Sequence, residues 1–280
     1  MRAARSPLDV LAADSRGRGR GPDLGLPPGA LITRPGRRLR RAVPLLWVSD
    51  AAVGGDCLAG HRGGAPAALG LYPVLLQDRR GLEEWWRLRE LYPERMSDPG
   101  DHDAGQVLRE HWSGAVPDPE EGAEGAELIA PFGRDWPGPA APLIAGQDPE
   151  AAAGALARDL VRDGGCLPSP RLALVPAGRG ADVLAAIGWG GPANHENDTA
   201  RIAAVLRSWE DRFGARVVAL GFDELHVSVA APPRTRAEAL AVAAEHFAFC
   251  PDNVWQGSGS IRAYADEALT GSAHWSFWWD

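Results

Sequence analysis

Apolar residues recur at helical intervals most clearly in the second half of the chain. In the segment TARIAAVLRSWEDRF they lie three or four positions apart, at Ile202, Val205, Leu206, Trp209 and Phe213. This spacing places one apolar stripe of an α-helix against a core. Asn197 or Asp198 can cap the start of that helix, and Gly214 can adopt the left-handed conformation that ends it. The pattern therefore predicts an amphipathic helix between these two signals.

Cap and turn signals predict the other elements of the second half. The sequence DPE beginning at Asp148 marks the start of a helix that runs to Arg162. Thr235 and Glu238 have the spacing of a capping box ahead of another helix. Short apolar runs bounded by turn residues predict a strand over 171–176, a short helix over 181–188, a hairpin of 215–222 and 225–230, a short helix over 261–268, and a C-terminal inner strand or packed tail, HWSFWWD.

The predicted hairpin has alternating apolar and polar positions in its second strand. Leu225, Val227 and Val229 alternate with His226 and Ser228, which indicates a strand with one buried face. The order helix, strand, helix, hairpin, helix predicts an α+β fold, a mixed α/β arrangement in which helices pack on one face of a mostly antiparallel sheet.

The first half of the chain has a different pattern. Apolar runs at 43–50 and 70–78 predict two buried strands, and residues 82–92 and 97–112 predict helices, which together indicate a smaller α/β half. A long segment rich in acidic residues, Gly and Pro has no period and predicts a linker or covering loop. We therefore expect a leader without fixed structure (1–24), an N-terminal half (25–112), that linker (113–146), and a C-terminal domain (147–280).

Charge is distributed unevenly along the 280 residues. All 29 basic residues are arginine, and the first 41 residues hold ten of them against three aspartates, so the body of the protein is acidic. An acidic body argues against binding to a DNA duplex, because phosphate contacts need clustered cations. The run SRGRGRG could contact RNA weakly, and a solvated tail is the simpler interpretation.

Composition also bears on the cellular compartment. No apolar run approaches the roughly 20 residues that a membrane-spanning helix needs, and the leader lacks the apolar stretch of a secretory signal. Cys57, Cys166 and Cys250 are widely separated and odd in number, which favours a reducing environment over a disulfide framework. Abundant Ala, Gly and Pro with no lysine indicate a GC-rich coding bias. The sequence thus predicts a cytoplasmic protein that does not bind membranes.

Four segments together closely resemble one known family. They are AVLRSWEDRFGARVVALGF, LHVSVAAPPRT, AEHFAFCPDNVWQG and the closing WSFWWD. Over about residues 171–280 the chain resembles an uncharacterised bacterial family, the domain of unknown function numbered four-two-five-three. PLLWVSD and YPVLLQD also resemble the N-terminal half of such proteins, whereas the Arg-rich leader and residues 51–69 depart from their pattern. The resemblance implies no reaction, substrate or catalytic residue.

Four charged residues crowd one stretch of the amphipathic helix: Arg207, Glu210, Asp211 and Arg212. Arg207 and Glu210 lie three positions apart and can pair on the helix surface. Arg212 points elsewhere, toward the hairpin edge, where its planar guanidinium could anchor an anion or a carboxylate. A solvated or structurally paired helix face is the simpler interpretation of the cluster.

His246 and Cys250 lie four positions apart near a helix end, a spacing that two ligands of one metal could use, with His226 or His195 completing the set. No second close pair follows, so we expect no metal and no other cofactor. His246 is then a cation favoured by the helix dipole, and Cys250 is a small buried apolar residue. The turn PAGRGADV lies between a strand and a helix, as phosphate-binding turns do, but it lacks the lysine of a P-loop.

The leading prediction is a binding or interaction module with a protein or small-molecule partner and an oligomeric state left open. Its functional face is predicted to contain Asn194, His195, Arg212, His226, Asp252, Asn253 and Trp255. The alternative is a small-molecule hydrolase in which His226 or His246 acts with Asp252 as acid and base. An enzyme needs these polar groups to converge in a pocket, whereas a module could leave Trp255 on a flat apolar patch.

Overall fold

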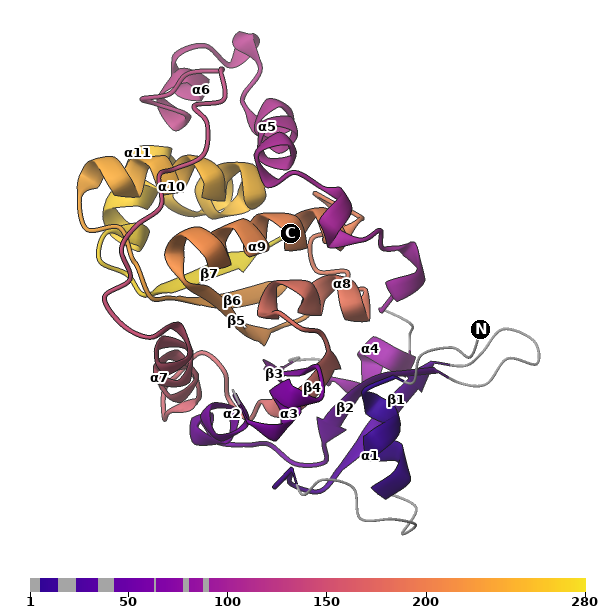
Figure 1. Ribbon diagram of the computed structural model, residues 1–280. Helices are drawn as coiled ribbons and strands as arrows, with labels where there is room; N and C mark the ends of the chain where they lie inside the picture. Colours follow the sequence, from indigo (N-terminus) through magenta and orange to yellow (C-terminus); the bar gives the residue numbers. More distant parts are fainter. Residues whose placement is uncertain (1–5, 15–23, 35–42, 63, 78–80, 88–90) are drawn as a thin grey trace.

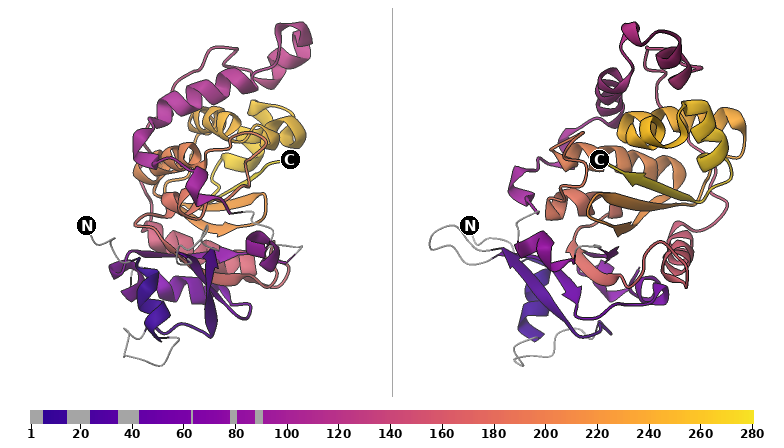
Figure 2. Two further views of the ribbon diagram at one scale, coloured as in Figure 1. Left: turned by 90° about the vertical axis from the view of Figure 1, so that its right-hand side faces the viewer. Right: turned by 180° about the vertical axis from the view of Figure 1, so that it is seen from behind.

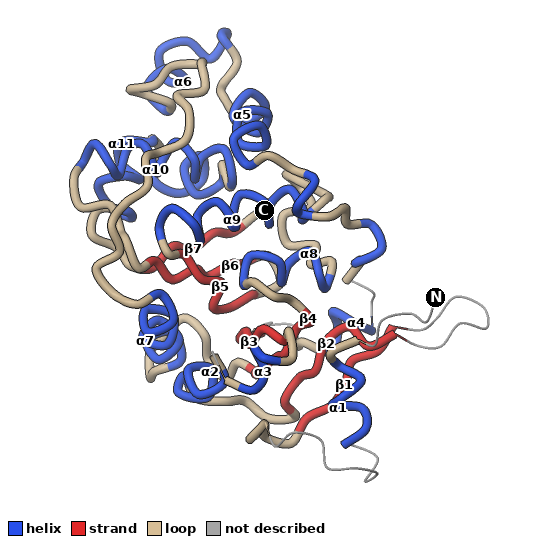
Figure 3. The backbone as a smooth tube through the Cα atoms, in the orientation of Figure 1, coloured by secondary structure: helices blue, strands red, loops and turns tan. Residues whose placement is uncertain are grey.

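One open sheet forms the centre of the fold. The computed structural model describes residues 6–14, 24–34, 43–62, 64–77, 81–87 and 91–280. Within these residues, seven strands lie in the order β1-β2-β4-β3-β5-β6-β7. They are β1 (Gly29–Arg34), β2 (Val43–Ser49), β3 (Leu71–Leu76), β4 (Arg171–Pro176), β5 (Ala215–Leu220), β6 (Glu224–Val229) and β7 (His274–Trp278). Figure 3 shows the strands running through the molecule between the helices.

Neighbouring strands of the sheet are antiparallel with one exception. β3 and β5 are parallel, and they pair only through Leu75 with Ala219 and Leu76 with Leu220. The pairs β1/β2, β2/β4, β3/β4, β5/β6 and β6/β7 are all antiparallel. The prediction of an α+β fold with a mostly antiparallel sheet is confirmed.

Helices connect the strands and cover them. The α-helices are α1 (Leu8–Asp14), α2 (Gly55–His61), α3 (Ala65–Ala68), α4 (Glu83–Arg87), α5 (Ala104–Ala115), α6 (Gly122–Leu128), α7 (Pro149–Val161), α8 (Val183–Ile187), α9 (Thr199–Phe213), α10 (Arg236–Phe249) and α11 (Ile261–Tyr264). Short 3₁₀ turns η1 (Pro93–Arg95), η2 (Pro99–Asp101), η3 (Pro119–Glu121) and η4 (Gly180–Asp182) and the π-helical segments η5 (Asn253–Ser258) and η6 (Ala265–Leu269) complete the set. In the described part of the chain, no helix is long and apolar enough to cross a membrane.

The helix ends predicted from cap residues are formed in the structure. Asp148 and Asp198 each accept a hydrogen bond from a backbone N–H in the first turn of α7 and α9. Thr235 and Glu238 make both bonds of a capping box at the start of α10. Gly214 ends α9 with a φ of 61°, a conformation that favours glycine. Local sequence therefore fixes these boundaries.

Helices cover both faces of the sheet. On one face, α9 and α10 pack on β6 and β7 in a large apolar core that includes Trp209, Val227 and Trp275. On the other face, α7 packs in a second core that includes Leu156 and Val218. We expected helices on one face of the C-terminal part, and α7 adds cover on the opposite face.

The second face of β6 is buried, contrary to the prediction of one buried face. His226 is 5% exposed and Ser228 is 0% exposed. The cause is α7, which packs against both β5 and β6 and comes from a distant part of the sequence. Alternation identifies which residues share a face of a strand, but it does not reveal whether a distant helix covers that face.

Segments that are distant in sequence lie together at one end of the molecule. α5 and α6 lie beside α10 and α11 in Figures 1 and 2, and Arg262 of α11 pairs with Glu127 of α6 at 3.1 Å. Strands from 25–112 and strands from 147–280 share one sheet, and the predicted linker contains α6. The domain boundaries stay predictions.

Part of the N-terminal leader is folded. Leu8 of α1 is 0% exposed and belongs to the second core, with Leu11 packed against it. The prediction of no fixed structure is therefore wrong for α1, because Leu8 and Leu11, three positions apart, lie on one side of the helix and pack against the second core. The rest of that prediction, for residues 1–5 and 15–23, lies outside the described residues.

Candidate functional site

Arg212 binds a carboxylate of its own chain. Its Nη1 and Nη2 donate to Glu245 Oε1 and Oε2 at 2.7 and 2.6 Å. Glu245 is 0% exposed and also accepts hydrogen bonds from Trp209 Nε1 and the backbone N–H of Ala140. Arg212 therefore joins α9 to α10 and to the covering loop, and its side chain is not free to receive a ligand.

The prediction that Arg207 and Glu210 pair with each other on the helix surface is wrong. Arg207 Nε donates instead to Asp182 Oδ1 at 2.5 Å. Glu210 accepts from Arg179 Nε at 2.7 Å and from the backbone N–H of Ala181 at 2.9 Å. Both partners lie in the turn after β4, because α9 packs against η4 and offers partners closer than its own neighbouring turn.

His246 is a neutral core residue, so the prediction of a dipole-stabilised cation is wrong. It is 0% exposed, and burial holds its pKa well below the ordinary value of 6.5. Its Nδ1 lies 3.0 Å from the hydroxyl of Tyr264. Cys250 is buried, as expected, and its Sγ donates to the carbonyl of Trp278 at 2.9 Å. The described residues contain no group of three or more His, Cys, Asp or Glu that could hold a metal.

The two histidines of the hydrolase alternative lie on opposite faces of the sheet. His246 packs against Trp275, on the face that α9 and α10 cover. His226 alternates with the core residues of β6, so it lies on the other face of the sheet. There its Nδ1 is 3.1 Å from Nε2 of His274. Asp252 hydrogen-bonds with Gln256 and with the backbone N–H of Asp280. The structure does not bring the proposed acid and base together.

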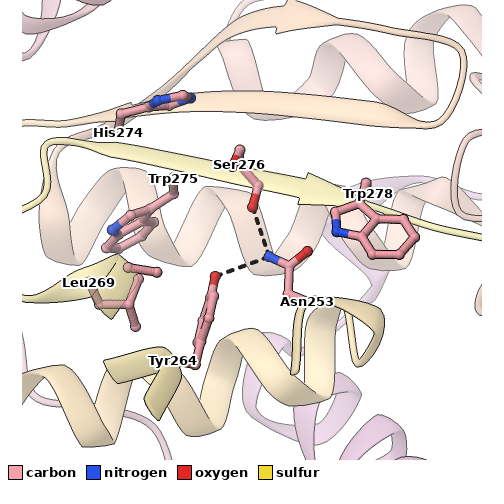
Figure 4. A pocket seen from close by; sticks show the side chains of 8 residues that line it. Asn253, Tyr264, Leu269, His274, Trp275, Ser276 and Trp278 are labelled. Carbon is pink, nitrogen blue, oxygen red and sulfur yellow. Dashed lines mark hydrogen bonds between the residues drawn. The ribbon is translucent and has the colours of Figure 1, made fainter. Parts of the chain in front are cut away.

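Residues 250–253 complete the free edge of β7 (Figure 4). Asn253 Nδ2 donates to the carbonyl of Ser276 at 2.7 Å and to the hydroxyl of Tyr264 at 3.0 Å. Cys250 Sγ donates to the carbonyl of Trp278, and Asp252 Oδ2 accepts from the backbone N–H of Asp280. A cavity of about 180 Å³ remains beside this edge. Because an unpaired edge strand is an aggregation hazard, Asp252 and Asn253 have a structural role here.

The other predicted binding residues lie around α5. His195 Nε2 is 3.1 Å from the carbonyl of Ala248, and its ring is 4.6 Å from that of His111 on α5. Burial, with His111 nearby, lowers the pKa of His195 to about 4. Trp255 is 39% exposed and its Nε1 donates to the carbonyl of Ala115, at the end of α5. Asn194 is exposed.

A charged cleft that the sequence analysis did not predict lies where β3 and β5 diverge. These strands pair only near their C-terminal ends, so their first residues stand apart beside the end of β4. The cleft has a volume of about 320 Å³, in the range of small-molecule sites. Its lining residues are mostly charged or glycine: Tyr72, Glu150, Gly178, Arg179, Gly180, Glu210, Asp211 and Arg216.

Glu150 holds two arginines at one side of this cleft. Its Oε1 accepts from Arg216 Nε at 2.6 Å and its Oε2 from Arg62 Nη1 at 2.8 Å. Arg62 lies behind the lining, over the ring of Tyr72, and its Nη2 donates to the carbonyl of Val217. Tyr72 donates to the same carbonyl at 3.3 Å. These side chains fill the gap that the missing β3/β5 ladder leaves.

The turn after β4 forms the other side of the cleft. Arg179 donates through Nε to Glu210 and through Nη2 to Asp211, at 2.7 and 2.6 Å. Glu210 also accepts a hydrogen bond from the backbone N–H of Ala181. A carboxylate of the chain therefore occupies the position that a phosphate takes in a phosphate-binding turn. A Cβ on Gly180 would lie 2.5 Å from the Tyr72 hydroxyl, so only glycine allows this approach.

The charges of the cleft shift one another's ionisation. Burial alone would raise the pKa of Glu150, but Arg62 and the hydrogen bonds from Arg216 and Arg62 outweigh it, and the pKa lies below its ordinary value. Burial raises the pKa of Tyr72 to about 12. Glu150 is thus ionised and Tyr72 protonated at neutral pH. Clustered perturbed groups in a cleft are typical of functional sites.

The cleft draws on two parts of the chain. Residues 171–280 match the family model Domain of unknown function (DUF4253). This confirms the resemblance seen in the sequence. The matched region supplies Arg179, Glu210 and Arg216, whereas Arg62 and Glu150 precede it. No curated protein and no solved structure matches the chain.

Only fragments of the cleft had a signal in the sequence. The turn PAGRGADV has the position of a phosphate-binding turn in the sequence, and it contributes Arg179 to the site. Glu150 was interpreted only as an acidic residue at a helix start. No pattern in the sequence indicates that Arg179 or Glu150 lies close to Arg216 or to Arg62.

Proposed function

We propose that this protein is a binding module whose cleft between β3 and β5 holds a small solute with charged groups. One observation carries the proposal. The side chain of Arg62 is 2% exposed, whereas its partner Glu150 is 40% exposed. A buried cation requires a partner, and here the partner is the group that solvent reaches. A ligand can therefore approach Glu150 from the solvent side without opening the core.

The chemistry of the cleft favours binding over catalysis. Arginine stays protonated at any physiological pH, and Tyr72, with a pKa of about 12, does not accept or lose a proton there. The described lining residues include no Ser, Cys or His that could act as a nucleophile or base. The hydrolase alternative has less support, because His226 and His246 have partners on opposite faces of the sheet.

A thermal-shift screen with matched variants tests the proposal. The full-length protein is heated with each of a panel of amino acids, sugars, nucleotides, phosphate and carboxylic acids. A ligand at 100 times its Kd contributes about 2.7 kcal/mol, which raises the Tm of a chain of this size by several degrees. The variant Arg216→Met removes a cleft donor, and Arg236→Met removes an arginine of an exposed surface pair with Asp266.

The expected result is a Tm increase in the wild type and in Arg236→Met, and a loss of that increase in Arg216→Met. If no member of the panel raises the Tm, the proposal is wrong. An equal increase in both variants would place the binding site elsewhere and contradict it as well.

A further inference from the structure

We infer that the ligand of this cleft is a zwitterion, with one carboxylate and one ammonium group, as in a free amino acid. The inference rests on the proposed function, because it names the class of solute that the same cleft binds. It is drawn from the balance and the arrangement of charges around the cleft, and from the atoms that those charges leave available.

The charges of the cleft are balanced. Three carboxylates and three guanidiniums lie in it or directly behind it: Glu150, Glu210 and Asp211, and Arg62, Arg179 and Arg216. They form two clusters on opposite sides of the cleft, one around Glu150 and one around Arg179. Each cluster contains both signs of charge.

This balance disfavours a ligand with a net negative charge. Sites for phosphate offer unpaired cations and free backbone N–H groups. Here Arg179 and Arg216 already donate to carboxylates, and the N–H of Ala181 donates to Glu210. An added anion could use only the one nitrogen that each arginine has left, and its charge would lie beside three carboxylates with no cationic group of its own to offset it.

A ligand with a net positive charge meets the reverse obstacle. Glu150 has two arginine partners, and Glu210 has one arginine and one backbone N–H. At Glu150 or Glu210 a cation would have to displace a group that the fold holds in place, such as Arg62, whose side chain is 2% exposed. Displacing Arg62 would leave a buried charge without its partner. At Asp211 a cation would lie beside Arg179 with no anionic group of its own to offset its charge.

A zwitterion matches the atoms that remain. Arg216 uses Nε and Nη1, and Arg179 uses Nε and Nη2, so each keeps one nitrogen that has no partner among the described residues. Asp211 is 68% exposed and uses only Oδ1. The ligand carboxylate can accept from the remaining guanidinium nitrogens, and its ammonium can donate to Asp211 Oδ2.

Binding of this kind leaves the net charge of the cleft unchanged. Each new contact pairs opposite charges, and no fixed ion pair has to break. The volume of about 320 Å³ suits a solute of amino-acid size, since pockets for larger ligands extend to roughly 1,000 Å³. A Cβ on Gly178 would meet nothing within 4 Å, so the wall is open at that point.

Calorimetric titration with chemically matched ligands tests the inference. The twenty standard L-amino acids are titrated into the full-length protein, and the tightest binder is compared with its amide, which lacks the carboxylate, and its N-acetyl derivative, which lacks the ammonium. Inorganic phosphate is the anionic comparison. We expect the amide, the N-acetyl derivative and phosphate to bind at least about tenfold more weakly, since each loses one charged contact.

A matched pair of variants locates the ammonium site. Asp211→Asn removes an exposed carboxylate in the cleft, and Asp266→Asn removes one at the remote pair with Arg236. Asp211→Asn should weaken the amino acid about tenfold and leave the affinity of the N-acetyl derivative unchanged. Asp266→Asn should change neither affinity.

The outcomes separate this inference from the proposed function. If phosphate, the amide or the N-acetyl derivative binds as tightly as the amino acid, and Arg216→Met abolishes that binding, the cleft is a binding site but its ligand is not selected as a zwitterion. If none of these solutes binds and the wider panel raises no Tm, both statements are wrong. Unchanged affinity of the amino acid in Asp211→Asn would contradict the inference alone.

Discussion

Two arginine–glutamate sites in this protein use the same chemistry with opposite exposure. In the first, Arg212 binds Glu245, whose side chain is 0% exposed and also accepts from Trp209 and the backbone of Ala140. In the second, Arg62 binds Glu150, and here the arginine is 2% exposed and the glutamate 40% exposed. In the first site the carboxylate is closed off and only 14% of the Arg212 side chain is exposed, whereas the carboxylate of the second opens into the cleft.

The difference indicates what each pair can do. The carboxylate of Glu245 has four hydrogen bonds with strongly held donors, so it has no capacity left for a ligand and serves to join three segments of the fold. Glu150 has its ion pairs on one side and solvent on the other. An ion pair can take part in binding when one of its members is accessible, and it is structural when the accessible surface is lost.

The largest expected effect is on the closed pair. Glu245→Ala leaves Trp209 Nε1 without its acceptor and Arg212 without its carboxylate, although Arg212 keeps the carbonyl of Ala140 and the hydroxyl of Ser208. Breaking a buried ion pair in this way costs about 3–5 kcal/mol. Urea denaturation followed by tryptophan fluorescence measures the free energy of unfolding. The exposed pair of Glu127 and Arg262 provides the control, because Glu127→Ala should change stability by less than about 1 kcal/mol.

A loss below about 1 kcal/mol in Glu245→Ala, equal to that of the surface control, would contradict the closed site. In that case water would have to reach the position of the Glu245 carboxylate, which is 0% exposed. The variant Glu245→Gln separates the effect of charge from that of shape, because it keeps the size of the side chain but removes the negative charge. Its free energy of unfolding should lie between those of the wild type and Glu245→Ala.

Removing the carboxylate of the open pair should have a smaller effect on stability. Glu150→Ala deprives Arg62 of one partner, but Arg62 keeps the carbonyl of Val217 and water can enter where Glu150 stood. We expect a loss of about 1–3 kcal/mol, the range for a buried donor that loses its partner. Urea denaturation of Glu150→Ala and Glu245→Ala under the same conditions compares the two losses in the free energy of unfolding. Equal losses in the two variants would mean that the second pair is closed as well.

The two pairs also differ in what the sequence could predict about them. Arg212 drew attention because it lies in a well-defined helix, α9, whose caps and apolar stripe are readable locally. Even so, Glu245 is 33 residues away, and no local pattern connects them. Arg62 and Arg216 lie 88 and 66 residues from Glu150. Periodicity and caps fix elements, whereas these pairings depend on how the elements pack.

The same limit explains the histidines. His226 has a polar position in an alternating strand, which predicts the less buried face of that strand. His246 lies near a helix end, where the helix dipole favours a cation. In the structure α7 covers the first, and the aromatic side chains Trp209 and Trp275 surround the second. Local position predicts the direction of a side chain, and the cover over it comes from distant residues.

The pH dependence of stability should reveal the exposed carboxylate. The folded-state pKa of Glu150 lies below its ordinary value of 4.5, so its ion pairs stabilise the fold above that pH, and this contribution is lost as the pH falls through the lowered pKa. Because Glu150 is 40% exposed, solvent screening should keep the contribution below about 1 kcal/mol.

Urea denaturation of the wild type and Glu150→Gln at several pH values from 7 to 3 would measure this contribution as the difference between the two proteins. The difference should shrink as the pH falls below about 4.5. A difference that stays constant, or grows in acid, would mean that Glu150 is not stabilised as an anion.

The smallest expected effect concerns the hydroxyl of Tyr72, which lies between the two clusters of the cleft. Its hydrogen bond to the carbonyl of Val217 is long, at 3.3 Å, and that carbonyl also accepts from Arg62. Tyr72→Phe therefore leaves no acceptor without a donor, and it should cost no more than about 0.5 kcal/mol, the lower end for a hydrogen bond. Urea denaturation should give nearly superimposable curves. A loss above about 1.5 kcal/mol would show that the hydroxyl, and with it the open side of the molecule, is held as tightly as the closed pair.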